Sequence, residues 1–294
     1  MSKNMKFAVI GGDLRFIKVT EFLIKYGHNV KTLGFNVADM TPDAEGLHKC
    51  SDIGCTVQDV DCIILPLPYT IDGKNVNAPF SKTPISLDAL YESASQCQLM
   101  VGGRLDDTAY QKAGYHGFRF IDYFDREELA VLNAIPTCEG AIQIVMEELP
   151  ITIHNSKCLI VGYGRIGKYL CKTLHGLGAN VTVAARKHSD IAWIKAFGYT
   201  PVYIDKIADG IDKYDFVINT APSLILDETH LINLKSDCLI IDLASKPGGV
   251  NFDAARQIGI KAIWALSLPG KVAPLTSGAI ITDTILNIMS EEVT

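Results

Sequence analysis

A glycine-rich turn near residue 162 has the residue types and the spacing needed to bind a phosphate. It follows the apolar run 158–161, precedes a helix-forming segment and reads Gly162-Tyr-Gly164-Arg165-Ile166-Gly167. Gly162 permits a tight turn, Gly164 lets the backbone approach a pyrophosphate, and Gly167 lets the helix pack closely on the strand. Because the helix N-terminus then faces the phosphates, the turn predicts dinucleotide binding, with Arg165 and Ile166 among the contacts. A glycine turn that serves packing alone is the alternative.

The end of the next apolar run indicates which dinucleotide is bound. The strand predicted over 181–186 ends at Arg186 and is followed by Lys187, where NAD-binding domains usually carry an acidic residue for the ribose hydroxyls. A guanidinium binds a 2′-phosphate through paired charge-assisted hydrogen bonds, whereas a carboxylate repels it. The sequence therefore favours NADP over NAD, with a solvated basic turn as the alternative.

Polar or small residues follow other apolar runs, at positions where open α/β sheets bind ligands. We expect one such segment to border the nicotinamide ribose, and its residues are Asn219, Thr220, Ala221 and Pro222. We expect two further segments, 102–104 and 243–249, to bind substrate carboxylates through Arg104, Ser245 and Lys246. Structural turns are the alternative at each position.

The segment 268–278, LPGKVAPLTSG, predicts a rigid and irregular loop because it holds two prolines and two glycines. We expect it to lie where the nicotinamide end of the site opens, which makes Lys271, Thr276 and Ser277 substrate-site candidates. The alternative is that Thr276 or Ser277 caps the helix predicted over 277–289.

A second glycine turn, Gly11-Gly12-Asp13-Leu-Arg15, follows the first apolar strand but lacks a third glycine at the required spacing. Asp13 stands where a diphosphate would be repelled, so we expect no second nucleotide site. We expect this turn to line the substrate side, with Arg15 either contacting an anion or forming a structural pair with Asp13.

General acid–base chemistry needs a titratable group in these loops, and none of the seven histidines falls there. This disfavours a histidine-dependent hydroxy-acid dehydrogenase. Glu139, Lys271 and Asp13 are the catalytic candidates, and the sequence does not choose among them.

The composition excludes several other classes of protein. With 48% hydrophobic and 20% charged residues and a formal charge of −6, the chain is typical of a globular protein without a nucleic-acid or anionic-membrane surface. No apolar stretch approaches the roughly 20 residues of a membrane span, and the first residues do not resemble a signal peptide, so we expect a cytoplasmic protein.

Four of the eight cysteines lie in apolar patterns and predict buried thiols: Cys62, Cys158, Cys171 and Cys238. The group His48, Cys50 and Cys55 is a weak metal alternative, and we predict no metal site.

Short apolar runs alternate with helical segments along the chain, which predicts an α/β fold of two Rossmann-like parallel-sheet domains separated by a cleft, the second binding the dinucleotide. The strands expected in the first domain are 7–10, 30–34, 62–65, 99–101 and 118–121. We expect residues 1–135 to form the substrate-side domain, completed by 277–294, and residues 136–276 to form the NADP-binding domain with a linking helix. Pro136 should break the helical stretch 125–149 into two helices.

Together, seven segments resemble the A subunit of bacterial dipicolinate synthase: GGDLR, NAIPTCEGAI, GYGRIG, VAAR, NTAPS, DLASKPGG and LPGKVAPLTSG. They span nearly the whole chain, and the last two are far more specific than the glycine turn. The resemblance implies an NADP-dependent enzyme of sporulating bacteria that oxidises dihydrodipicolinate, or its hydroxytetrahydro precursor, to dipicolinate. It also implies a flavoprotein-like partner, the B subunit, and a location in the mother-cell cytoplasm, and it is compatible with a homo-oligomer.

Two other functions are compatible with the same motifs. DLASKPGG and the following proline–glycine segment are also similar to dehydrogenases of the methylenetetrahydrofolate or alanine dehydrogenase type. The other alternative is a non-catalytic subunit, in which NADP only stabilises a complex whose chemistry lies in the partner.

Overall fold

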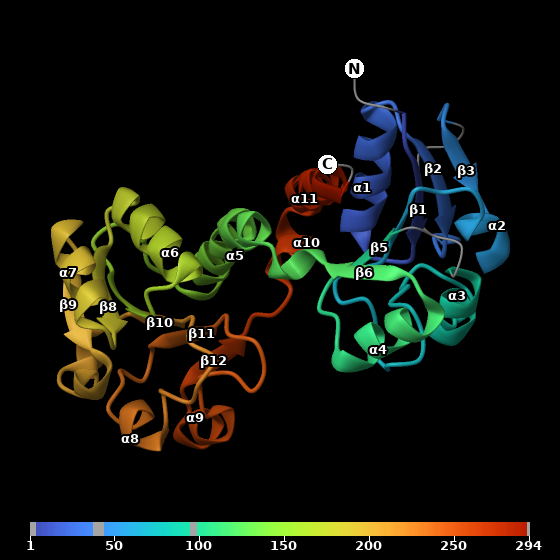
Figure 1. Ribbon diagram of the computed structural model, residues 1–294. Coiled ribbons are helices and arrows are strands. Elements are labelled where there is room, and N and C mark those ends of the chain that lie inside the picture. Colours follow the sequence, from blue (N-terminus) through green and yellow to red (C-terminus); the bar gives the residue numbers. More distant parts are fainter. Residues whose placement is uncertain (1–3, 38–43, 95–98, 293–294) are drawn as a thin grey trace. The chain divides into compact units, whose positions relative to one another are not determined.

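The computed structural model describes residues 4–37, 44–94 and 99–292. The chain divides into two compact units, which we call unit 1 (residues 1–132 and 273–294) and unit 2 (residues 133–272). Each unit contains one six-stranded parallel sheet, so the predicted α/β class is confirmed (Figure 1). The sequence predicts boundaries at 135/136 and 276/277, whereas contacts divide the structure after residues 132 and 272.

The sheet of unit 1 has the strand order β3-β2-β1-β4-β5-β6. Its strands are β1 (Lys6–Ile10), β2 (Asn29–Leu33), β3 (Leu47–Lys49), β4 (Cys62–Ile64), β5 (Leu99–Gly102) and β6 (Arg119–Asp122). Its helices are α1 (Leu14–Lys25), α2 (Ile53–Val57), α3 (Leu87–Ser93), α4 (Asp107–His116) and α11 (Pro274–Glu292), with a 3₁₀ turn η2 (Tyr123–Asp125). The sequence predicted five of these strands and missed β3, whose three residues are half-buried or exposed and lack an apolar pattern.

The sheet of unit 2 has the strand order β12-β11-β10-β7-β8-β9. Its strands are β7 (Lys157–Val161), β8 (Asn180–Ala185), β9 (Thr200–Tyr203), β10 (Phe216–Asn219), β11 (Leu239–Asp242) and β12 (Lys261–Trp264). Its shorter segments are α6 (Arg165–Gly176), α7 (His188–Ala196), α8 (Glu228–Leu231), α9 (Phe252–Ile258), α10 (Leu268–Val272), η3 (Ile204–Lys206) and η4 (Ile211–Lys213). The sequence did not predict β9, an edge strand that contains Pro201.

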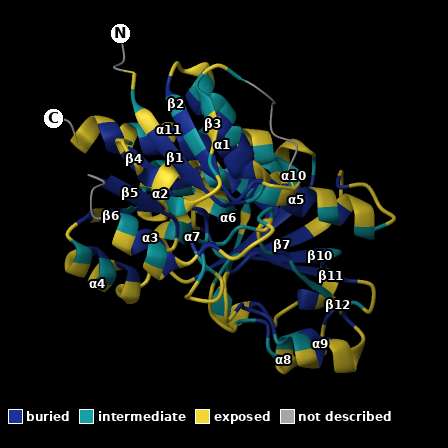
Figure 2. Cartoon of the chain, turned by 90° about the vertical axis from the view of Figure 1, so that its right-hand side faces the viewer, coloured by how far each residue is buried: buried dark blue, intermediate teal, exposed yellow. Residues whose placement is uncertain are grey.

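Both sheets are covered on both faces, so their central strands are buried (Figure 2) and are continuous apolar runs. In β7, Cys158 and Ile160 pack into one core and Leu159 and Val161 into the other. The four cysteines predicted to be buried are buried. Burial raises the pKa of Cys158 and of Cys238 to about 12, so both stay protonated thiols at neutral pH.

The expectation that Pro136 divides the linking stretch is wrong, because one helix, α5 (Glu127–Glu148), runs through it. Proline removes one N–H donor, whose acceptor would be the carbonyl of Leu132. Leu132 itself is exposed, whereas Cys138 and Ala141 of the following turns are buried in the core of unit 2, so their packing outweighs the loss of one hydrogen bond. In the described part of the chain, α5 alone is long and apolar enough to cross a membrane, and its buried residues contribute to cores.

The irregular loop expected over 268–278 is also wrong. Residues 268–272 form α10, and α11 begins at Pro274, a residue that suits the first turn of a helix because its missing N–H is not needed there. Thr276 and Ser277 lie inside α11, so the alternative in which one of them caps the last helix is wrong as well.

Candidate functional site

The turn between β7 and α6 has the geometry that its glycine spacing predicts. Gly162 has a φ of +101°, and a Cβ there would lie 2.5 Å from the Thr220 hydroxyl. A Cβ on Gly167 would overlap the carbonyl oxygen of Gly162, so this glycine allows the helix to pack on the turn. Gly164 is the N-cap of α6, makes no side-chain cap and has nothing within 4 Å of its Cβ position. The start of α6 therefore borders open space.

This open space is a hollow of about 660 Å³, which we call the α6 hollow. Its lining residues are Gly162, Tyr163, Gly164, Arg165, Ile166, Ala185, Arg186, Lys187, Asp190, Ile204, Thr220, Ala221, Pro222, Ser223 and Ile225. The volume falls within the range of small-molecule and cofactor sites. The site residues predicted from the turn and from the segments 186–187 and 220–222 thus line one hollow, with the exception of Gly167, which does not contact it.

Several residues of this hollow were not predicted from the sequence. Ile204 follows the unpredicted strand β9, and Tyr163 lies between two glycines of the motif, where its type carries no signal. Burial raises the pKa of Tyr163 to about 12, so its hydroxyl is neutral at physiological pH. Asp190 lies in the first turn of α7 and adds a carboxylate to the lining that also contains Arg186.

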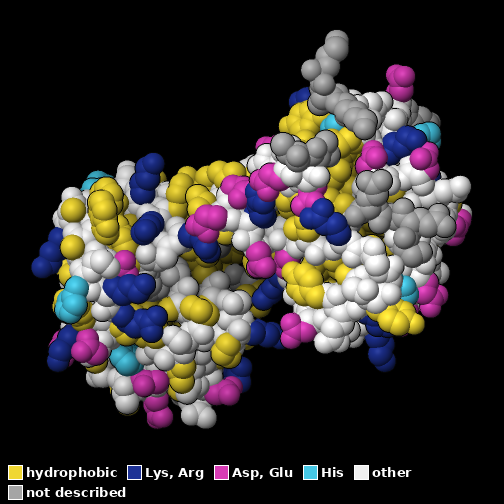
Figure 3. Space-filling model, in the orientation of Figure 1, with side chains coloured by type: hydrophobic (Ala, Val, Ile, Leu, Met, Phe, Trp, Pro, Cys, Tyr) yellow, Lys and Arg dark blue, Asp and Glu magenta, His cyan; other side chains and the backbone are white. Residues whose placement is uncertain are grey.

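A second hollow of about 550 Å³, the β9 hollow, shares Arg186 and Ile204 with the first. Its other lining residues are His188, Tyr203, Asp205 and Lys206, and His188 Nδ1 lies 2.8 Å from the Tyr203 hydroxyl. Figure 3 shows Lys and Arg side chains, with histidine among them, on the part of unit 2 that β8, β9 and α7 form. The two hollows together combine the cations Arg165, Arg186, Lys187 and Lys206 with the carboxylates Asp190 and Asp205.

Asn219 does not line the α6 hollow, because its side chain is fully buried beneath it. Its Nδ2 donates to Asp242 Oδ1 at 2.7 Å and to the Ala221 carbonyl at 2.9 Å. Asp242, also 0% exposed, accepts the backbone N–H groups of Ala244 and Gly249. This buried network fixes the segments 219–222 and 242–249 against each other, and Asn219 acts as a positioning residue.

The remaining predicted residues of unit 2 are exposed. Ser245 and Lys246 lie in the loop that Asp242 organises, Glu139 lies on α5, and Lys271 lies on α10. Gly140, next to Glu139, packs against Leu268 and Val272, so α5 and α10 are in contact there. Glu139 and Lys271 therefore stand on neighbouring helices.

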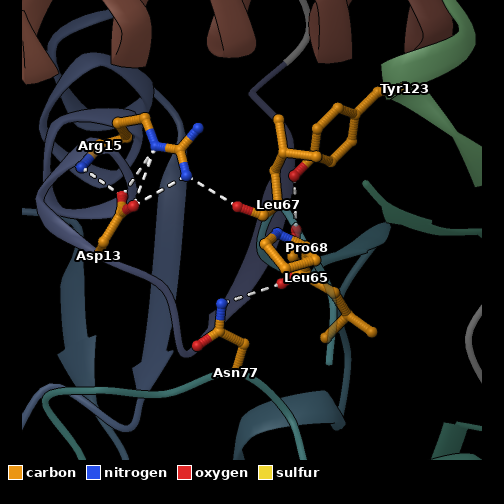
Figure 4. Close-up of polar contacts among 7 residues, drawn as sticks. All are labelled: Asp13, Arg15, Leu65, Leu67, Pro68, Asn77 and Tyr123. Atoms are coloured by element: carbon orange, nitrogen blue, oxygen red, sulfur yellow. Dashed lines mark hydrogen bonds and ion pairs between the residues drawn. The ribbon is translucent and has the colours of Figure 1, made fainter. Parts of the chain in front are cut away.

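In unit 1 the predicted residues Asp13 and Arg15 form an ion pair, with Arg15 Nη2 2.8 Å from Asp13 Oδ2 (Figure 4). Asp13 caps α1 and accepts the N–H of Arg15, while the Arg15 guanidinium also donates to the Leu67 carbonyl at 2.7 Å. Gly278 of α11 packs on the first turns of α1 near Arg15 and Lys18, and Thr276 and Ser277 lie in the turn before it. Thr276 is exposed and Ser277 is buried.

Arg104 lies at the end of β5, exposed, with a φ of +62°. Its backbone N–H and that of Leu105 donate to the carboxylate of Asp122, and its guanidinium lies 5.9 Å from the centre of the Phe124 ring. Burial raises the pKa of Asp122, although these backbone N–H groups oppose the shift. Asp122 thus holds the Arg104 backbone in place without pairing with its charge.

Comparison with known proteins identifies both units. A family model that describes the N-terminal domain of the dipicolinate synthase A subunit matches residues 6–124. A second, described as the D-isomer specific 2-hydroxyacid dehydrogenase NAD binding domain, matches residues 141–245. The A subunit of dipicolinate synthase from Bacillus subtilis (strain 168) is 34% identical over 99% of this chain and 98% of its own length.

Solved structures agree with these matches. The crystal structure of the dipicolinate synthase A chain from Bacillus subtilis covers 99% of this chain and 97% of its own with a TM-score of 0.88 at 34% identity. The A subunit from Bacillus halodurans covers 98% of both chains with the same TM-score at 31% identity. A transhydrogenase from Sinorhizobium meliloti, 14% identical, covers 97% of this chain and 94% of its own with a TM-score of 0.70, and shares the fold alone. The chain therefore belongs to the family of dipicolinate synthase A subunits, and its second unit is a dehydrogenase domain of the type that binds a nicotinamide dinucleotide.

Proposed function

We propose that this protein oxidises dihydrodipicolinate, or its hydroxytetrahydro precursor, to dipicolinate with NADP as the cofactor. The observation that carries the proposal is the open N-terminus of α6 beside Arg186 and Lys187, in a chain that belongs to the family of dipicolinate synthase A subunits. The α6 hollow fits a dinucleotide, because Gly164 leaves the helix N-terminus uncovered and no carboxylate caps it.

In this proposal the chain's own residues divide the binding between them. The first turn of α6, with Arg165, Ile166 and Gly167, binds the pyrophosphate, and Arg186 and Lys187 bind the 2′-phosphate. Thr220, Ala221 and Pro222 border the nicotinamide ribose. Gly162 lets the turn approach Thr220 closely, because it has no Cβ to meet the Thr220 hydroxyl. Bound NADP supplies the hydride acceptor.

The substrate side needs cations and a proton acceptor. A dihydropyridine ring that loses a hydride and a proton becomes an aromatic pyridine, so the protein's task is to orient the ring and to receive the proton. Arg15, Arg104, Ser245, Lys246, Thr276 and Ser277 are the candidates for binding the two carboxylates. Glu139, Lys271 and Asp13 are the candidates for receiving the proton.

The name of the relatives also supports a partner, since an A subunit implies at least one other subunit. We propose that this partner is a flavoprotein-like B subunit, that the complex works in the cytoplasm of the mother cell during sporulation, and that the chain also forms a homo-oligomer. An alanine dehydrogenase structure shares the fold at 16% identity, and this likeness lends no support to amino-acid turnover.

The experiment mixes the purified chain, alone and with its B subunit, with NADP and freshly generated dihydrodipicolinate precursor, and follows absorbance in the NADPH band. We expect NADP to be reduced while dipicolinate appears in equal amount. Dinucleotide binding without turnover in both mixtures would overturn the proposed reaction and favour a non-catalytic subunit. Turnover of an amino acid or of a reduced pterin in place of the precursor would favour another dehydrogenase type.

A further inference from the structure

The carboxyl edge of the sheet in unit 1 holds a buried guanidinium with unused donors, and we propose that Arg15 binds a carboxylate of the substrate. This inference deepens the proposed function and rests on it for the identity of the ligand. Among the candidate cations, Arg15 is assigned to the carboxylate, and Asp13 competes with that carboxylate for the Arg15 guanidinium.

The hydrogen bonds of Arg15 leave one of its nitrogens open. Arg15 is only 6% exposed, and its Nε donates to both oxygens of Asp13, at 2.9 Å and 3.1 Å. Its Nη2 donates to Asp13 Oδ2 at 2.8 Å and to the Leu67 carbonyl at 2.7 Å. A guanidinium has five N–H groups, so the two on Nη1 have no acceptor among the residues that the structure describes.

Solvent reaches this nitrogen. Among the described residues, every side-chain nitrogen or oxygen that is sealed from solvent has a hydrogen-bond partner, so Nη1, which has none, is accessible. Figure 4 shows this terminal nitrogen pointing away from both Asp13 and Leu67. A mostly buried cation with an accessible pair of donors is the arrangement that charge-assisted binding of an anion requires.

The location agrees with a ligand site. Strands β1 and β4 are neighbours in the sheet although they are not consecutive in the chain, and open α/β sheets bind ligands at such a point. Arg15 follows β1, and Leu67 follows β4, so their hydrogen bond crosses this point.

The surrounding chain holds the guanidinium in place. The Leu65 carbonyl accepts the Tyr123 hydroxyl at 3.0 Å, and the Pro68 carbonyl accepts Nδ2 of Asn77 at 3.2 Å. Together with Arg15 at Leu67, these bonds fix the segment 65–68 at three positions. A ligand therefore meets a preorganised donor and loses little conformational entropy in ordering it.

The charges favour a carboxylate over a phosphate. Asp13 already neutralises much of the Arg15 charge, and its carboxylate repels a second anion nearby. A phosphate dianion would suffer twice that repulsion and would find only two N–H groups for its oxygens. A singly charged carboxylate matches the two donors that remain.

The test measures binding of pyridine-2,6-dicarboxylate to the full chain by calorimetry, with and without NADP, and NADP binding separately. Arg15→Gln should weaken dicarboxylate binding at least about 30-fold while the Kd for NADP changes less than twofold. Asp13→Asn should tighten dicarboxylate binding more than twofold, because asparagine still caps α1 but no longer competes as an anion for the guanidinium. The matched control is Arg119→Gln, since Arg119 lies in unit 1 at the start of β6 and pairs with Glu292.

The opposite signs of the two variants separate a binding role from a structural one. If Arg15 only ties α1 to the Leu67 segment, both variants lower the melting temperature and neither changes dicarboxylate affinity more than twofold, which overturns the proposal. If Arg15→Gln does not fold, weaker dicarboxylate binding by Asp13→Asn overturns it and tighter binding supports it. Wild-type protein that binds no carboxylate overturns it as well. Arg15-dependent binding without any turnover overturns the proposed reaction and leaves this site standing.

Discussion

The two sheets share one strand order, yet the turns after their first strands have different chemistry. Numbered within each unit, both sheets run 3-2-1-4-5-6, and in both the first strand leads through a glycine turn into a 12-residue helix. The order is that of dinucleotide-binding domains in both cases. The fold by itself therefore does not decide which of the two units binds a nucleotide.

The difference lies in what occupies the start of the helix. In unit 1 the Asp13 carboxylate caps α1, and the N–H of Gly12 donates to the Asn77 carbonyl at 2.9 Å. Groups of the chain itself therefore occupy the hydrogen-bonding positions that a phosphate would use in a dinucleotide-binding turn. In unit 2 the cap is Gly164, with no side chain and nothing nearby. We infer that the capping residue, rather than the topology, determines which anion each edge can accept.

The largest expected effect is a loss of stability when a buried aspartate at the end of a strand is removed, and each unit has such an aspartate. Asp242→Ala should lower the free energy of unfolding by about 4 kcal/mol, because two backbone N–H groups and the Asn219 amide lose an acceptor in a buried site. Both tryptophans, Trp193 and Trp264, lie in unit 2, and Trp264 donates to the Ala244 carbonyl in the affected loop. Tryptophan fluorescence during urea unfolding therefore measures this loss.

The matching change in unit 1 is Asp122→Ala. Asp122 accepts the N–H groups of Arg104, Leu105 and Phe124, so its loss should also be costly. We expect it to shift the unfolding transition seen by circular dichroism more than the one seen by tryptophan fluorescence. Equal shifts in both signals would show that the two units unfold as one.

The second effect transfers the cap of unit 1 to unit 2. Gly164→Asp should weaken dinucleotide binding at least about 100-fold, or about 2.7 kcal/mol, because a carboxylate then caps α6 and repels the pyrophosphate. The fold should tolerate it, since the Cβ position is open and the φ of −82° suits any residue. Fluorescence titration with NADPH measures the affinity.

The matched control is Gly176→Asp, which makes the same change at the other end of α6, where the Cβ position is also open. It should leave the affinity within about threefold of the wild type. If Gly164→Asp binds the dinucleotide as well as the wild type does, the capping residue is not what distinguishes the two units.

The sequence predicted the sheets better than the parts that connect them. Runs such as 158–161 and 216–219 are buried on both faces, so their composition alone identifies them as strands. Pro136 and the segment 268–278 led to wrong predictions, because proline lowers helix propensity locally while burial of neighbours such as Cys138 and Leu268 decides the outcome. No local pattern could show that Asn219 is buried against Asp242, since the contact joins two strands 23 positions apart.

For the candidate site, the spacing of residues within one segment predicted a group that lines a single hollow. The residues 162–167 act as a unit because strand, turn and helix are consecutive, and Arg186 was located by the end of the next strand. Ile204 and Asp190 come from segments without a motif and join the α6 hollow only through tertiary packing. The Arg15–Leu67 hydrogen bond likewise spans 52 positions, and from sequence an anion contact and a pair with Asp13 were equally plausible.

The smallest expected effect concerns the basic end of the α6 hollow, formed by Arg186 and Lys187 of unit 2. Arg186→Gln should raise the Kd for NADP about tenfold, or about 1.4 kcal/mol, and leave the Kd for NAD within twofold, because only NADP carries the 2′-phosphate. The loss stays modest, since Lys187 and Lys206 line the same region while Asp190 and Asp205 offset part of its charge. Arg256→Gln, an exposed arginine on α9, is the control. If Arg186→Gln weakens NAD and NADP binding equally, Arg186 binds the diphosphate that both dinucleotides share. If the wild type binds NAD more tightly than NADP, the carboxylates of the hollow, not its cations, determine which dinucleotide unit 2 prefers.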